Sequence, residues 1–157
     1  MQIYGKYFSN EFKKYYIEDM KDSIGLIDFK ALDSRNFEVL YYLFPLIEKL
    51  FIEVLKYNID SDIELYNQGT YRTLESALEK SENHKFFNED LIRVIHFFYN
   101  KGGLRNKLFH YTGATINITT FDILATKCIA LQLLKTYKNK IEESNNNYNN
   151  DKIELLK

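Results

Sequence analysis

The sequence predicts an all-α fold, an up-and-down bundle of about four to five helices. The chain has 157 residues with one proline and six glycines, too few for a loop-rich or all-β protein of this length. Apolar residues recur at steps of three and four over long stretches, which is the spacing of one helix face. Hydrophobic residues make up 45% of the chain, enough for the core of one domain.

The strongest helical pattern runs over residues 34–58. Additional apolar residues lie beside and behind its main seam, so the pattern predicts a helix that is central in the bundle or lies at a subunit interface. Pro45 lies inside it and predicts a kink, because proline removes one intrahelical hydrogen bond. The seam consists of Phe37, Leu40, Phe44, Ile47, Phe51 and Val54.

Weaker patterns on either side complete the predicted bundle. Residues 1–33 form a lead-in with a short helix over 10–22 and a connector over 23–33. Further helices are expected over 70–81, and from Asn88, a good N-cap, to the Gly102–Gly103 pair.

The last helix is expected to begin at Thr119 or Thr120, either of which could cap it. We place the bundle at 34–141. Residues 142–157 are rich in asparagine and predict a flexible tail, because they can bury little apolar area. The expected core face of this last helix is Phe121, Leu124, Cys128, Leu131 and Leu134.

The composition also indicates the cellular compartment in which the protein is expected. No apolar run reaches the roughly 18 residues of a membrane span, and no secretory leader is recognisable, so we expect a soluble cytoplasmic protein without a membrane partner. Cys128 is the only cysteine and cannot form an intrachain disulfide, as expected in a reducing compartment. Its helical apolar context predicts core packing rather than a nucleophile.

The formal net charge of −1 conceals a local basic stretch. Between Asp90 and Asp122 there is no acidic residue, while two arginines and two lysines give these positions a charge of +4. Such a stretch is typical of a surface that meets an anion. A solvated surface without a ligand is the alternative. The four cations are Arg93, Lys101, Arg105 and Lys107.

The segment "NKGGLRNKLFHYTG", residues 100–113, lies inside this basic stretch and combines residues suited to phosphodiester chemistry. Asn106 and His110 are four positions apart, so on a helix they lie within about 40° of each other and the amide can orient the imidazole. The guanidinium of Arg105 matches phosphate oxygens, and a histidine can exchange a proton near neutral pH. Together they suit cleavage without a metal.

An arginine, a polar residue and then a histidine, placed between the last two long helices of a small helical bundle, resembles the motif of the HEPN-domain family. Here the matching residues are Arg105, Asn106 and His110, and the order of helices extends the resemblance over about 34–141. Many members are metal-independent endoribonucleases of toxin–antitoxin, abortive-infection and CRISPR-associated systems.

The resemblance implies a homodimer whose two motifs face each other and form one cleft for RNA. The RNA 2′-hydroxyl would attack and leave a cyclic phosphate, with no cofactor. Arg105 would polarise the phosphate, His110 would act as general acid or base, and Asn106 would orient either group. An antitoxin or other regulatory protein would be a partner. Members paired with a nucleotidyltransferase antitoxin often carry tyrosine where this chain has Thr112, which speaks against that antitoxin.

Three other side chains are candidates for contact with RNA. Lys101 and Lys107 could meet phosphates, although solvated lysines are equally common, and Tyr111 could stack on a base.

Several alternatives remain open at the level of sequence. Arg105 could donate hydrogen bonds to carbonyl groups at a helix end, and His110 could be hydrogen-bonded within the core. Alternatively, the chain could be a non-catalytic dimeric module that binds a nucleotide, RNA or a partner protein. A metal site is disfavoured, because His84, His96, His110 and Cys128 include no closely spaced ligand pair. We expect His96 to be partly buried.

Overall fold

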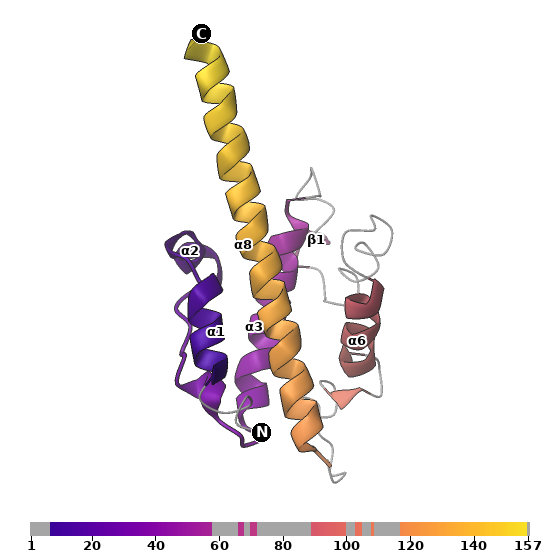
Figure 1. Ribbon diagram of the computed structural model, residues 1–157. Coiled ribbons are helices and arrows are strands. Elements are labelled where there is room, and N and C mark those ends of the chain that lie inside the picture. The colour runs from indigo at the N-terminus through magenta and orange to yellow at the C-terminus, as the bar shows by residue number, and fades with distance from the viewer. Residues whose placement is uncertain are drawn as a thin grey trace.

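The computed structural model describes residues 7–57, 66–67, 70–71, 89–99, 103–104, 108 and 117–156. These residues are mostly helical, as the all-α prediction requires (Figure 1). In chain order the elements are α1 (Tyr7–Tyr15), the 3-10 turn η2 (Glu18–Met20), α2 (Lys21–Ile24), the 3-10 turn η3 (Ala31–Asp33), α3 (Val39–Leu55), β1 (Tyr66–Asn67), β2 (Thr70–Tyr71), α6 (Glu89–Tyr99) and α8 (Thr120–Leu156).

Helices α3 and α8 form the centre of the bundle and run in the same direction (Figure 1). Near the start of α3, Lys127 of α8 reaches the backbone of Ser34, with 2.7 Å between Nζ and the carbonyl oxygen. Just beyond the end of α3, the ring of Tyr57 lies 6.2 Å from that of Tyr137 on α8. The two contacts therefore fix a parallel pair.

Helix α1 packs on α8 and is parallel to it as well. Lys127 Nζ lies 5.5 Å from the ring centroid of Phe8, near the start of α1. At the end of α1, Lys135 and Lys138 lie 5.0 Å and 5.6 Å from the ring centroid of Tyr15. α1 is thus held along its length by α8, with lysine side chains over aromatic rings.

The predicted up-and-down order is therefore wrong for the first two long helices. α1 and α3 point the same way, and the chain returns between them through η2, α2, the irregular residues 25–30 and η3 (Figure 1). Gly25 ends α2 at φ +76°, a conformation that glycine adopts readily and other residues rarely do. This short connector replaces the descending helix that an up-and-down bundle would need.

Helix α3 is central, the first of the two predicted alternatives. It buries residues over most of its circumference and leaves one narrow side exposed, where Tyr41, Pro45 and Lys49 lie four positions apart. It begins at Val39 rather than near residue 34, so the predicted seam residue Phe37 precedes it and is exposed. Pro45 lies inside it, and the predicted kink stays a prediction. Its buried residues are Val39, Leu40, Leu43, Phe44, Leu46, Ile47, Leu50, Phe51, Ile52, Val54 and Leu55.

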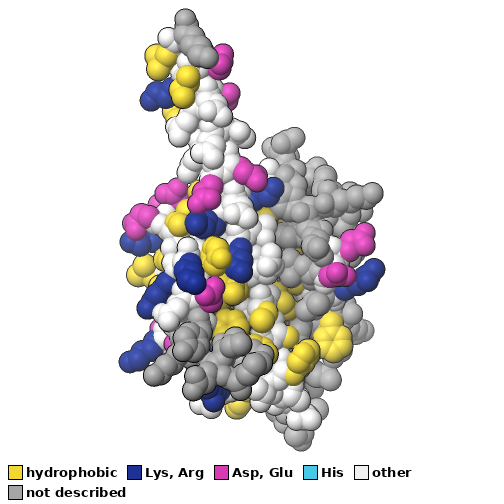
Figure 2. All heavy atoms as spheres, viewed as in Figure 1, with side chains coloured by type: hydrophobic (Ala, Val, Ile, Leu, Met, Phe, Trp, Pro, Cys, Tyr) yellow, Lys and Arg dark blue, Asp and Glu magenta, His cyan; other side chains and the backbone are white. Residues whose placement is uncertain are grey.

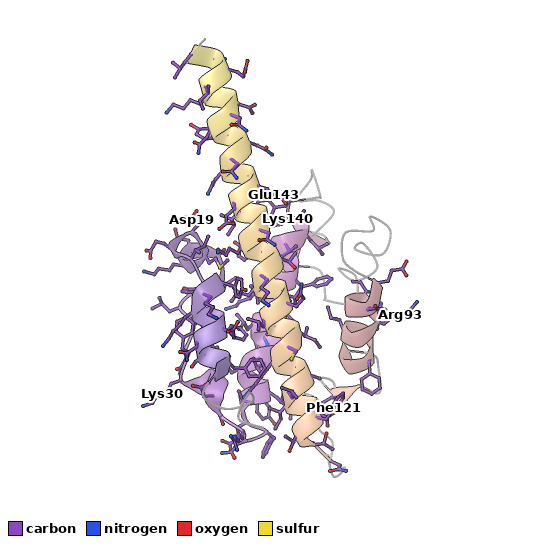
Figure 3. The ribbon with its side chains drawn as sticks, viewed as in Figure 1. Asp19, Lys30, Arg93, Phe121, Lys140 and Glu143 are labelled. Carbon is purple, nitrogen blue, oxygen red and sulfur yellow. The ribbon has the colours of Figure 1, made fainter. Side chains whose placement is uncertain are left out.

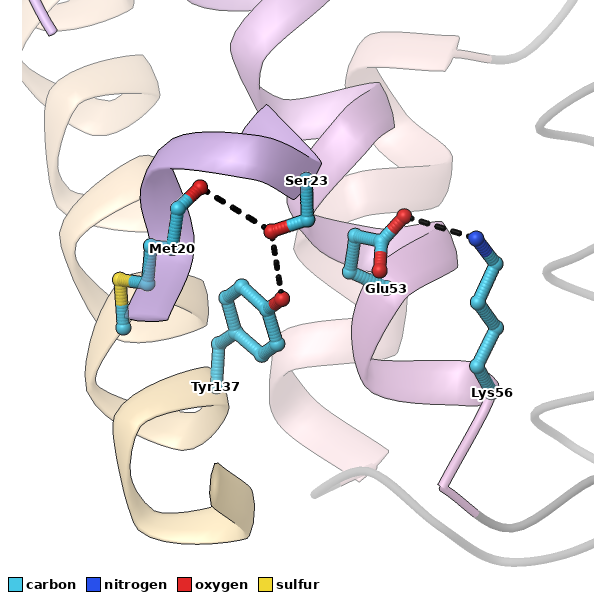
Figure 4. A network of polar contacts seen from close by, with 5 residues as sticks. All are labelled: Met20, Ser23, Glu53, Lys56 and Tyr137. Atoms are coloured by element: carbon cyan, nitrogen blue, oxygen red, sulfur yellow. Dashed lines mark hydrogen bonds and ion pairs between the residues drawn. The ribbon is translucent and has the colours of Figure 1, made fainter. Parts of the chain in front are cut away.

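The single helix predicted over 10–22 is instead two helices separated by a bend. α1 ends at Tyr15, Ile17 is extended, and η2 and α2 follow. The bend lets α2 dock on α8, where the hydroxyls of Tyr137 and Ser23 share a hydrogen bond of 2.7 Å (Figure 4). Ser23 in turn donates to the carbonyl of Met20 at 3.1 Å. Since tertiary hydrogen bonds stabilise this bend, local periodicity alone could not predict it.

A two-stranded hairpin lies where the prediction placed the start of the third helix. Tyr66 pairs with Tyr71 and Asn67 with Thr70 in antiparallel register. The prediction of helix at residues 70 and 71 is therefore wrong, and the rest of that range lies outside the described residues. Thr and Tyr both favour extended structure, which fits the strand that forms.

Helix α8 begins with a reciprocal cap. The Thr119 hydroxyl oxygen accepts a hydrogen bond from the backbone N–H of Asp122 at 3.2 Å, and the Asp122 carboxylate accepts one from the N–H of Thr119 at 2.9 Å. Two N–H groups that the helix leaves without an intrahelical partner are thereby satisfied. Of the two predicted caps, Thr119 is the one that the structure uses.

We expect Thr119→Ala to lower the free energy of unfolding by about 1 kcal/mol, because the cap bond is lost. Thr120→Ala is the matched control. It removes the same hydroxyl one residue later, where the side chain is exposed, and should change stability by less than about 0.5 kcal/mol. Urea denaturation of both variants measures the difference, and equal losses would contradict the capping role.

The predicted flexible tail differs from the structure, because residues 142–156 continue α8 as regular helix beyond the bundle (Figure 1). Lys138 pairs with Glu142 at 3.5 Å and Lys140 with Glu143 at 3.6 Å, so ion pairs one turn apart cross the boundary. Adding residues to a formed helix avoids the unfavourable nucleation step. The asparagine-rich composition therefore did not prevent helix formation, although these residues are exposed.

Candidate functional site

The described residues between α6 and α8 include Leu108, which contacts the start of α3. In this segment the described residues are 103–104, 108 and 117–119. Gly103 and Leu108 are buried, and Leu104 packs partly buried on the core. The hydroxyl of Tyr41, near the start of α3, donates to the carbonyl oxygen of Leu108 at 3.5 Å. Leu108 is therefore attached to the first turn of the central helix.

The residues of the predicted motif lie outside the described part of the chain, and so do the predicted RNA contacts. Their neighbours in sequence are nevertheless informative. Leu104 and Leu108 are four positions apart and both join the hydrophobic core, on either side of the first motif residues. The predicted site residues outside the described ranges are Arg105, Asn106, His110, Lys101, Lys107 and Tyr111.

Helix α6 leads into this segment and is anchored by Ile92 and Ile95, both in the core. The helix predicted from Asn88 to the Gly102–Gly103 pair is confirmed over Glu89–Tyr99, whereas residues 88 and 100–102 lie outside the described residues. His96 is partly buried, as expected. α6 therefore presents one apolar face to the bundle and the opposite face to solvent.

One cation of the basic stretch already has a partner on α6. Arg93, which projects outward from α6 (Figure 3), forms an ion pair with Asp90 at 3.8 Å, and both side chains are largely exposed. Exposed pairs of this kind contribute little to stability and are screened by salt. Arg93 can therefore exchange Asp90 for a stronger anion at low cost.

The core face predicted for α8 was rotated from the real one. Phe121 was expected to be buried and is 68% exposed, and Cys128 is exposed as well. Of the other predicted residues, Leu134 is buried, and Leu124 and Leu131 are partly buried against the core. The described seam begins at Ile123 and proceeds in steps of four and three residues. The seam consists of Ile123, Lys127, Ala130, Leu134, Tyr137 and Ile141.

Exposure of Cys128 corrects the prediction of core packing. Partial desolvation raises the pKa of its thiol, against a smaller opposite effect of Lys135. A raised pKa leaves less thiolate at neutral pH, and the thiolate is the nucleophile. The prediction that this cysteine is no nucleophile is therefore consistent with its environment, although its location was wrong.

Lys127 is the feature of this region that the sequence prediction missed. Its side chain is 1% exposed, and its ammonium donates to the Ser34 carbonyl under the Phe8 ring. Asp33 lies close enough to favour its charge, and the Asp33 carboxylate also accepts a hydrogen bond from the N–H of Ser9 at 3.1 Å. The cation thus joins α1, η3 and α8 at one point.

A lysine within an apolar seam was the signal available in the sequence. Position 127 lies seven residues before Leu134 and fourteen before Ile141, on the same face of the helix. Buried lysines need a hydrogen-bond partner. That partner, Ser34, lies 93 residues away in sequence, so the pairing could not be read from local pattern.

Burial lowers the pKa of Lys127, Asp33 opposes this effect, and Arg35 adds to it. The folded state therefore holds this proton less tightly than the unfolded chain, and stability should rise with pH between the lowered pKa and the unfolded value of about 10.4. We expect the wild type to gain stability relative to Lys127→Met as pH rises from about 8 to 10. Urea denaturation at several pH values measures this, and a constant difference between the two proteins would refute it.

Within the described residues, no group of three histidine, cysteine, aspartate or glutamate side chains could hold a metal ion. Nor is any helix in that part of the chain both long and apolar enough to span a membrane.

Comparison with protein-family models, with curated proteins and with solved structures found no match. Any function is therefore argued from the residues of this chain.

Proposed function

We propose that this protein is a metal-independent endoribonuclease of the HEPN type, acting as a toxin or as an effector of anti-phage defence. The observation that carries the proposal is the sequence Arg105-Asn106 followed by His110, within a stretch that has four cations and no acidic residue. Each residue type suits one part of the reaction.

The chemistry requires a charged donor at the phosphate and a proton carrier beside it. Arg105 neutralises the charge that builds on the phosphoryl oxygens, and its planar fork can contact two of them. His110 takes the proton of the 2′-hydroxyl or gives one to the leaving oxygen. Asn106 fixes the orientation of the imidazole or the phosphate. The products are a 2′,3′-cyclic phosphate and a free 5′-hydroxyl.

Two features of the described residues support this proposal. The chain on either side of the motif belongs to helices that reach the core through Ile95 and Ile123. Within the segment, Leu104 and Leu108 also pack on the core. A catalytic segment needs such support, because a displacement of about 1 Å can cost two orders of magnitude in rate.

The proposal includes a homodimer, in which the two copies of the motif form one cleft for RNA. Lys101 and Lys107 would meet phosphates, and Tyr111 would stack on a base. The protein would work in the cytoplasm, with an antitoxin or another regulatory protein as partner, and without a cofactor.

Cleavage of RNA in excess chelator tests the proposed activity. We expect the purified protein to cut single-stranded RNA in the presence of EDTA and to leave a cyclic phosphate, because no metal takes part. Cleavage that disappears with EDTA and returns with Mg²⁺ would refute the mechanism.

A second candidate function is a non-catalytic helical module that binds a nucleotide, RNA or a partner protein. It is favoured by the extension of α8 beyond the bundle, where Leu155 is 87% exposed and lies seven residues from exposed Tyr148, on the same side of the helix. Toxicity on expression that His110→Ala abolishes at unchanged protein level would favour the enzyme. Binding without turnover of any RNA tested would favour the module.

A further inference from the structure

Helix α8 has a second apolar side, which faces away from the bundle. Phe121 is 68% exposed, and Cys128, seven residues later on the same side of the helix, is exposed as well. Leu124 and Leu131 flank this side and are only partly buried against the core. Figure 2 shows hydrophobic and uncharged side chains at the surface over the first turns of α8, and Figure 3 places Phe121 near its start. A helix with apolar residues on opposite sides is normally covered on both.

The outward side of α8 also carries no exposed charge over three turns. Among residues 123–134, all of which the structure describes, Lys127 is the only charged residue, and it is 1% exposed. Before this stretch, the carboxylate of Asp122 accepts the backbone N–H of Thr119 in the helix cap. After it, Lys135 is the first charged residue with a partly exposed side chain. The apolar strip is therefore uncharged along its length and ends at a lysine.

This pattern favours a second copy of the chain as the occupant. A contact across a two-fold axis sets a surface against itself, so any charge near the axis would meet its own sign. The ends of the strip fit such a contact as well. Phe121 and Lys135 each lie seven residues from Cys128, so in an antiparallel pair with its axis at Cys128 the ring of one copy lies opposite the lysine of the other. Lysine is a favourable neighbour of an aromatic ring, whereas parallel helices would set Lys135 against Lys135.

We propose that two copies of this protein pair through the outward side of α8, with the two helices antiparallel and crossing near Cys128. Phe121, Leu124 and Leu131 of each copy form the apolar contact on either side of the axis. The inference rests on the homodimer of the proposed function, whose interface that proposal leaves open. It requires neither RNA nor catalysis, so the two proposals can fail separately.

Light scattering of the full chain tests the surface. The wild type should have twice the chain mass of 18.8 kDa, and Phe121→Lys should weaken pairing by more than about tenfold, because it sets two lysines against each other at both ends of the strip. Adding Lys135→Glu to Phe121→Lys should recover most of the affinity, since each new lysine then lies opposite a glutamate. Tyr148→Lys is the matched control: Tyr148 is equally exposed on α8 but lies outside the strip, and the variant should remain a dimer.

Oxidation of Cys128 tests the antiparallel crossing. With copper phenanthroline as the oxidant, the wild type should form a disulfide-linked dimer and Cys128→Ser should not, because a disulfide needs Cα atoms less than about 7 Å apart. Asn139→Cys in the Cys128→Ser background is the matched control, since Asn139 is exposed on the same side of α8. It lies eleven residues from Cys128, so its two copies would be about 33 Å apart and should stay unlinked. Non-reducing electrophoresis measures both variants.

Three outcomes would overturn the inference: a monomeric wild type, a dimer that Phe121→Lys leaves intact, or linkage through Asn139→Cys as efficient as through Cys128. The second outcome would place the interface elsewhere, and the third would make the pair parallel. Circular dichroism verifies that the variants fold. If the protein pairs through α8 but cuts no RNA, the nuclease proposal fails and this inference stands. If RNA is cut and the substitutions on α8 do not change the mass, the reverse holds.

Discussion

Arg105→Ala and His110→Ala are each expected to lower the rate of RNA cleavage by about 10²–10⁴-fold. Loss of a histidine acid or base removes a contribution of this size, and loss of a donor to the developing oxyanion costs about 10²–10³. The cleavage rate under saturating protein with a labelled RNA in EDTA measures both effects. The free energy of unfolding should be unchanged within about 1 kcal/mol, which separates lost chemistry from lost structure.

Lys107→Ala is the matched control, because it removes a cation between the two motif residues. We expect a loss of less than about tenfold that shrinks at high salt, since a lysine contact to phosphate is mainly electrostatic. Equal rates of RNA cleavage by the wild type, Arg105→Ala and His110→Ala would contradict the proposed mechanism. A loss for Lys107→Ala as large as for His110→Ala would show that charge, not proton transfer, explains the activity.

Phe51→Ala is expected to lower the free energy of unfolding by about 3–5 kcal/mol, on the order of 10 °C in melting temperature. Phe51 is fully buried one turn before the end of α3, which packs against α8 as the centre of the bundle. The substitution removes a ring and leaves a cavity that surrounding helices can close only in part. Urea denaturation and thermal melting followed by circular dichroism measure the loss.

Phe37→Ala is the control for this substitution, because Phe37 precedes α3 and is partly exposed. We expect a loss of less than about 1 kcal/mol there. If Phe51→Ala cost no more than Phe37→Ala, α3 would not be the central helix and the assignment of the core would be wrong.

Sequence periodicity predicted the central helices because their apolar residues face one continuous core. α3 and α6 lie where the pattern placed them, apart from the later start of α3 at Val39, and the start of α8 was predicted to within one residue by Thr119. The cap could be predicted because it is a local feature. The hydroxyl and the carboxylate are three residues apart, and each accepts a hydrogen bond from the backbone N–H of the other residue. Such features need no information from distant parts of the chain.

The failures have a common cause in distant contacts. The bend after α1 is stabilised by the hydrogen bond between Ser23 and Tyr137 of α8. The face of α8 that is buried includes Lys127, whose ammonium donates a hydrogen bond to the carbonyl of Ser34. The predicted face was chosen from apolar residues alone, so it omitted Lys127 and included Phe121 and Cys128, which are exposed. No local rule could have revealed partners so far away in sequence.

The candidate site was predicted from residue types rather than from periodicity. The prediction used the chemistry and spacing of Arg105, Asn106 and His110, both of which can be read from the sequence without a structure. The exposure of Phe97 and Phe121 could not be predicted in the same way, because an aromatic residue in a helical pattern is usually core.

Replacement of the single 2′-hydroxyl at the cut site by hydrogen tests the central claim most directly. The claim is that this protein cleaves RNA by internal attack of that hydroxyl, aided by Arg105 and His110. We expect the 2′-deoxy substrate to bind with an affinity similar to that of the all-RNA strand and to remain uncut in EDTA, while the all-RNA strand yields a 2′,3′-cyclic phosphate. Cleavage of the deoxy-substituted strand at the same bond and at a comparable rate would contradict the account.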